Sequence, residues 1–188
     1  KALMDKEGHL EWFNAFFGEK PQAMFVIAPA LFNGGCCYGP RRRDSAGNET
    51  LYCILGVWKT APDGLPEFTP DMLETVVHEF AHSYANPIVD RHRAELQSAG
   101  NTLFRSVSAQ MRSQAYGDSQ TMLRESLVRA CEVRYTFRYR GAEAGRRSVG
   151  FQKSRGFFWM EELSNLLAQY EAQRERYPTL DSFSPRLA

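Results

Sequence analysis

Residues 69–86, TPDMLETVVHEFAHSYAN, contain an HExxH motif at residues 78–82, and the rest of the sequence is best understood from it. In a helix, residues four apart lie one turn apart on the same face, so the imidazoles of His78 and His82 can reach one ion. The carboxylate of Glu79 then lies beside that ion without binding it. Such a motif is typical of a zinc site in which the two histidines are ligands and the glutamate is the general base.

The residues around the motif predict a buried helix. Thr69 is a good N-cap and Pro70 suits the first helical turn. Apolar residues surround the motif on nearly all sides: Leu73, Val76, Val77, Phe80, Ala81 and Tyr84. Because the residue before a proline is pushed out of the helical region, we expect the helix to end at Asn86-Pro87. The alternative to a metal site is a core in which both histidines are satisfied by hydrogen bonds.

Length and composition indicate one globular domain over residues 1–188. A chain of 188 residues can bury a substantial core, and its hydrophobic content is 43%. A formal net charge of +1 gives no electrostatic case for a nucleic-acid partner or an anionic membrane. No stretch approaches the roughly 18 apolar residues of a membrane span. The sequence begins at Lys1 without an initiator Met, as expected of a trimmed piece of a longer chain.

The first third of the chain predicts a small sheet. Residues 24–31 and 51–58 are compact apolar runs, and we expect two strands that pair antiparallel. Residues 33–49, rich in glycine and arginine, predict a long loop or an irregular hairpin between them. Residues 1–20 carry clustered aromatic residues and predict a short helix packed on the core.

The remainder of the chain predicts helices. We expect helical pieces within 88–117 that break at Gly100-Asn101, a capped turn at 116–119, a helix over 119–139, a loop over 140–156 and a helix over 157–176. The expected fold class is therefore α+β. A small antiparallel or mixed sheet packs on the motif helix and precedes a mostly helical C-terminal part.

The four cysteines do not have the CxxC spacing of a cysteine zinc site. They are Cys36, Cys37, Cys53 and Cys131. Cys36 or Cys37 could form a disulfide with Cys53 across a hairpin, and buried free thiols are an equal alternative. The sequence therefore leaves the redox compartment open.

A catalytic zinc site needs a third protein ligand. In the longer HExxHxxGxxH pattern that ligand is a histidine, but Ile88 takes its place here. A glutamate on a later helix is the alternative. We expect Glu125, which lies on the predicted 119–139 helix with Arg129 one turn later to hold it. Glu132 on the same stripe is the competing candidate, and a surface ion pair between Glu125 and Arg129 is the reading without a metal.

Two segments carry a resemblance to a known family. HEFAHSYANP and, some forty residues later, YGDSQTMLRESLVRA resemble the gluzincin branch of the zincin metalloproteases. They are more similar still to the bacterial zincin-like DUF4932 family, over residues 51–135. The resemblance implies a zincin-like fold and peptide hydrolysis. It also implies Zn²⁺ held by His78, His82 and Glu125, with Glu79 as base.

The resemblance has two further implications. The strand at residues 51–58 would lie at the edge of the cleft and pair with an extended peptide substrate. The family's location would be extracellular or periplasmic.

The chemistry expected is metal-assisted amide hydrolysis by a zinc metallopeptidase. Glu79 takes a proton from the metal-activated water and returns it to the leaving amine. The tetrahedral oxyanion needs a further donor, for which Tyr116 is nominated and Tyr135 is the alternative. Two other functions compete with this one: a catalytically inactive zincin-like binding module, and a metal-free structural domain in which the motif residues form a polar network.

Overall fold

The computed structural model describes residues 2–18 and 23–187, which form two compact units. The N-terminal unit comprises residues 1–15 and 19–83, and the C-terminal unit comprises residues 16–18 and 84–188. Over the described residues the chain is mostly helical with one three-stranded mixed sheet, so the predicted α+β class is confirmed. The single domain expected over residues 1–188 stays a prediction.

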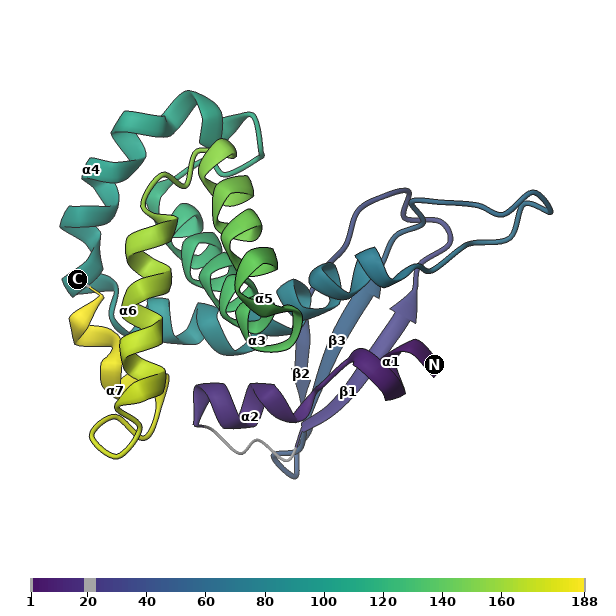
Figure 1. The fold of residues 1–188 in the computed structure, drawn as a ribbon, viewed down its shortest axis with the longest axis horizontal. Coiled ribbons are helices and arrows are strands. Elements are labelled where there is room, and N and C mark those ends of the chain that lie inside the picture. Colours follow the sequence, from purple (N-terminus) through teal and green to yellow (C-terminus); the bar gives the residue numbers. More distant parts are fainter. Residues whose placement is uncertain (1, 19–22, 188) are drawn as a thin grey trace. The chain divides into compact units, whose positions relative to one another are not determined.

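The sheet lies in the N-terminal unit and has the order β1-β3-β2 (Figure 1). Its strands are β1 (Ala23–Pro29), β2 (Arg41–Arg43) and β3 (Glu49–Leu55). β1 pairs parallel with β3, so the antiparallel pairing that we predicted for these two strands is wrong. The residues between β1 and β3 are numerous enough to return the chain to the end of the sheet at which β1 began. They also contain β2, which pairs antiparallel with β3.

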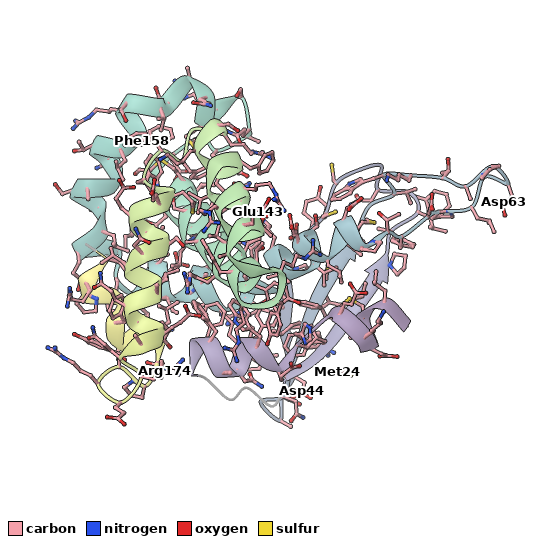
Figure 2. All side chains as sticks on the ribbon, in the orientation of Figure 1. Met24, Asp44, Asp63, Glu143, Phe158 and Arg174 are labelled. Atoms are coloured by element: carbon pink, nitrogen blue, oxygen red, sulfur yellow. The ribbon has the colours of Figure 1, made fainter. Side chains whose placement is uncertain are left out.

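The β2–β3 connection confirms the irregular hairpin expected within residues 33–49. Asp44 lies in the turn that joins the two strands (Figure 2). Its carboxylate accepts hydrogen bonds from the backbone N–H groups of Ala46 and Asn48, both at 2.9 Å. An aspartate that binds the backbone two residues ahead favours a tight turn, which fixes the register of the hairpin.

β3 is the central strand of the sheet, so the prediction that it is an edge strand open to an extended peptide is wrong. β1 hydrogen-bonds to one side of it, and β2 together with a bridge between Tyr38 and Ile54 occupies the other. Periodicity in the sequence marks a strand but not its neighbours. The edges of this sheet are β1 and β2.

Two short helices replace the single helix predicted over residues 1–20. They are α1 (Ala2–Glu7) and α2 (Glu11–Phe17), and His9 between them has a left-handed φ of 38°. The ring of Phe13 in α2 lies 5.7 Å from that of Phe25 and 6.0 Å from that of Phe80. The rings of Phe25 and Phe80 are 4.9 Å apart. This aromatic cluster fixes the motif helix on the sheet, because buried aromatic contacts bring both large apolar area and specific geometry.

The motif helix, α3 (Leu73–Arg91), continues through Pro87, so the predicted end at Asn86 is wrong. A proline inside a helix leaves the carbonyl four residues earlier without its usual N–H donor. Here that carbonyl belongs to Ser83, and it accepts a hydrogen bond from Arg41 Nη1 at 3.5 Å. A hydrogen bond from β2 thus partly replaces the helical hydrogen bond that Pro87 removes.

The helices of the C-terminal unit differ from the prediction at two glycine-containing segments. They are α4 (Arg93–Arg112), α5 (Ser119–Ser154), α6 (Met160–Ala172) and the short α7 (Leu180–Phe183). No helix break occurs at Gly100, which is buried in α4 where a side chain would meet Leu123 at 2.5 Å. Glycine occupies position 100 because α4 packs closely against Leu123 there, and not because the helix ends.

The loop predicted over residues 140–156 is also wrong, because most of that segment is helical. Gly141, with φ 84° and ψ 170°, makes a sharp turn inside α5, and the chain then returns to a helix. Gly145 lies against the ring of Phe137, where an added Cβ would be 2.4 Å from ring atoms. The capped turn at 116–119 is confirmed, since Asp118 accepts from the N–H of Thr121 at 2.8 Å.

Two negative findings complete the description. None of the described helices is both long and apolar enough to cross a membrane. Cys36, Cys37, Cys53 and Cys131 are all free thiols, so the disulfide alternative is not realised.

Gly39→Ala is expected to lower the free energy of unfolding by about 2 kcal/mol or more. The added methyl group would lie 1.9 Å from the carbonyl oxygen of Glu79, a backbone atom that cannot turn aside. Urea unfolding followed by circular dichroism measures the change. Gly150→Ala is the matched control, since nothing lies within 4 Å of its Cβ position and alanine favours the helix. Equal stability of Gly39→Ala and wild type would contradict the packing described.

Candidate metal centre

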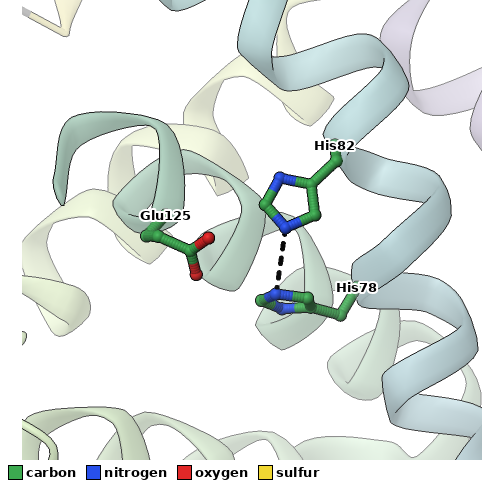
Figure 3. A group of neighbouring side chains, drawn as sticks. All are labelled: His78, His82 and Glu125. Atoms are coloured by element: carbon green, nitrogen blue, oxygen red, sulfur yellow. Dashed lines mark hydrogen bonds between the residues drawn. The ribbon is translucent and has the colours of Figure 1, made fainter. Parts of the chain in front are cut away.

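Helix α3 brings the two motif histidines together. The Nε2 atoms of His78 and His82 are 3.2 Å apart, and the two rings are nearly perpendicular at 84° (Figure 3). That distance suits either one N–H···N hydrogen bond or two bonds to a shared cation. A tetrahedral zinc ion with Zn–N bonds of about 2.0–2.1 Å places two ligand nitrogens about 3.4 Å apart. The separation of the two nitrogens is therefore close to the one that a shared zinc ion requires.

Glu125 completes a possible ligand set. The side chains of His78, His82 and Glu125 offer ligand atoms that all lie within 4.8 Å of one another (Figure 3). Two imidazoles and a carboxylate are donors that zinc and related divalent cations accept. This group could hold a metal ion. Glu132, the competing candidate, lies outside it.

Glu79 is buried on α3 beside His78. Burial raises the pKa of the Cys53 thiol, and the negative charge of Glu79 raises it further. Burial likewise raises the pKa of Cys37, where the charge of Glu79 adds to the effect and the N–H of Gly56 opposes it. The general-base candidate therefore has two thiols in its electrostatic surroundings. The sequence did not indicate this neighbourhood, although alternation along β3 places Cys53 on the buried face.

Arg129 forms a buried ion pair with Glu125, so the alternative of a surface pair is wrong. Arg129 Nη2 lies 3.3 Å from Glu125 Oε2, and the two side chains are only 7% and 10% exposed. The same Nη2 donates to the hydroxyl of Tyr116 at 2.7 Å, and Nη1 donates to Gln152 Oε1 at 3.0 Å. The guanidinium also lies over the ring of Phe157, 5.0 Å from its centre.

The two nominated tyrosines have different surroundings. Burial raises the pKa of Tyr116, and the charge of Glu125 raises it further while Arg129 lowers it. The Tyr116 hydroxyl accepts a hydrogen bond from Arg129, the residue that pairs with Glu125, so the structure brings Tyr116 near the third ligand candidate. Tyr135 is buried, and its ring lies 4.8 Å from that of Tyr139 in the same helix.

Glu132 lies deeper in the same polar network. Burial raises its pKa to about 7, while Arg129, Arg155 and a hydrogen bond from Gln152 oppose the rise. Gln152 Nε2 donates to Glu132 Oε1 at 3.3 Å. The remaining histidines lie beside acidic groups: His92 is 3.2 Å from Asp181, and His9 is paired with a glutamate.

Glu132→Gln is expected to change how stability depends on pH. The folded-state pKa of Glu132, about 7, exceeds its ordinary value of 4.5. Below pH 4.5 the carboxyl is protonated in both the folded and the unfolded state, so it does not lower the free energy of unfolding. That free energy falls as pH rises through about 7, because the unfolded state loses this proton more readily. The glutamine variant should exceed wild type by roughly 1–3 kcal/mol at pH 8 and converge with it near pH 4.

Urea unfolding at several pH values, with chelator present to remove metal effects, measures this difference. A stability difference between Glu132→Gln and wild type that stays constant from pH 4 to pH 8 would contradict a raised pKa of Glu132.

Comparison with known proteins gives one result. A family model described as "Domain of unknown function (DUF4932)" matches residues 1–188, so the similarity extends well beyond the residues 51–135 on which we recognised it. No curated protein and no solved structure gave a match. Because the model covers the whole chain, the protein belongs to the DUF4932 family.

Proposed function

We propose that this protein is a zinc metallopeptidase of the gluzincin type with a zincin-like catalytic arrangement. The observation that carries the proposal is the convergence of His78, His82 and Glu125 within 4.8 Å, on a motif that also supplies Glu79. Two histidines four apart on one helix and a glutamate from a later helix are the donors of a His-His-Glu zinc site.

The donor set is suited to catalysis as well as to binding. Three protein ligands leave one coordination position open, which distinguishes catalytic zinc sites from closed structural ones. A zinc ion bound there would supply Lewis acidity and a water molecule of lowered pKa. The imidazoles are neutral donors and Glu125 contributes one negative charge, so the site would keep a net positive charge to polarise a carbonyl group.

Glu79 is the proposed general base. Its carboxylate follows His78 directly in the helix and is buried, so it can take a proton from water next to the ligands and deliver it to the leaving amine. The aromatic cluster of Phe13, Phe25 and Phe80 fixes the helix that carries it. A base held this way needs little reorganisation before proton transfer.

The proposed substrate is a peptide, bound by strand addition along the edge of the sheet at residues 38–43. This segment runs antiparallel to β3 through the Tyr38–Ile54 bridge and β2. It also follows α3, because Gly39 lies against the Glu79 carbonyl and Arg41 donates to the Ser83 carbonyl. An edge beside the motif helix is where extended backbone would meet the base.

Glu79→Gln is expected to retain zinc and to lower kcat by about 10²- to 10⁴-fold, because the amide cannot accept the proton. Elemental analysis and cleavage of a peptide library measure the two properties. Glu143→Gln, which removes an exposed carboxylate, is the control and should cleave at the wild-type rate. Zinc binding without cleavage by wild type would favour the inactive binding module, and absence of stoichiometric metal would favour a structural domain.

Glu125→Gln is expected to lose zinc, whereas Glu132→Gln should keep it. Both variants exchange a buried carboxylate for an amide on the same helix, so they differ in ligand role more than in size. Dialysis followed by elemental analysis compares their zinc contents. Retention of zinc by the first and loss by the second would reverse the ligand assignment.

A further inference from the structure

We propose that Tyr116 and Arg129 are positioning residues that hold the carboxylate of Glu125 ready for a metal ion. In this role Tyr116 is not the oxyanion donor for which the sequence nominated it. The inference rests on the proposed function, because it assumes that Glu125 is a metal ligand. It adds the side chains that would determine how tightly the ion is held.

A hydrogen bond from Arg129 defines the role of Tyr116. A guanidinium can only donate, so the 2.7 Å contact makes the Tyr116 oxygen the acceptor from Arg129 Nη2. The same Nη2 lies 3.3 Å from Glu125 Oε2, so Tyr116 holds the nitrogen that faces the carboxylate.

Arg129 is fixed from the other side. Gln152 Oε1 accepts from Nη1 at 3.0 Å, and the amide of Gln152 is itself oriented because its Nε2 donates to Glu132. The ring of Phe157 covers one face of the guanidinium. In this position of the guanidinium, Nη2 contacts both Tyr116 and Glu125.

Burial strengthens the attraction between Arg129 and Glu125. The side chains of Arg129 and Glu125 are 7% and 10% exposed, so water screens their attraction little. Loss of one partner of a buried ion pair leaves an uncompensated charge. The carboxylate of Glu125 is thus held in one orientation, which a metal ligand requires. Partners that orient a ligand in this way typically contribute 10- to 100-fold to metal affinity.

The test measures zinc affinity and turnover separately for wild type, Tyr116→Phe and Arg129→Lys. Zinc Kd comes from competition with a chromophoric chelator, and kcat is measured at saturating zinc. Both variants should raise the zinc Kd 10- to 100-fold. Tyr116→Phe should keep kcat within about tenfold of wild type. An oxyanion donor would give the reverse result, an unchanged Kd and a kcat lower by about 10²- to 10³-fold.

Tyr177→Phe is the control, because it removes a tyrosine hydroxyl from the same unit, at a ring that packs on Phe183, and should leave Kd unchanged. The absorption spectrum of Co²⁺-loaded Tyr116→Phe should differ from that of wild type, which a purely structural role would not produce. If wild type binds zinc and Tyr116→Phe binds it equally well, the positioning role is overturned alone. If wild type binds no zinc, the proposed function is overturned and this inference with it.

Discussion

The candidate site depends on helix geometry, which places the imidazoles of His78 and His82 one turn apart on the same face of α3. Their Nε2 atoms are 3.2 Å apart, close to the separation that one tetrahedral ion imposes on two nitrogen ligands. The helix that sets this spacing is held in place because Phe80 on it packs among Phe13 and Phe25. Contacts from residues 38–43, including Gly39 against Glu79 and Arg41 at Ser83, support the helix on another side.

A second constraint concerns buried charge. Glu125, Arg129 and Glu132 are all buried, and isolated charges in such surroundings would be costly. Arg129 lies 3.3 Å from the carboxylate of Glu125, while burial raises the pKa of Glu132 to about 7. Two carboxylates on one helix therefore have different properties, and the one paired with arginine is the one that lies with the histidines.

The parts of this account that the sequence predicted are those with local signals. The HExxH spacing placed both histidines on one face, and the stripe on the 119–139 helix led to Glu125 and Arg129. Strand direction, the central place of β3 and the continuation of α3 past Pro87 depend on partners distant in sequence, such as Arg41, and had no local signal. Gly100 and Gly145 suggested breaks but serve close packing, a distinction that only their neighbours Leu123 and Phe137 reveal.

The most direct test of the central claim is X-ray absorption spectroscopy at the zinc edge, on protein purified without added metal and then loaded with one equivalent of zinc. The account predicts two imidazole nitrogens at about 2.0–2.1 Å together with carboxylate and water oxygen, and one imidazole fewer in His82→Ala. A spectrum with oxygen ligands only, or one identical in wild type and His82→Ala, would contradict it.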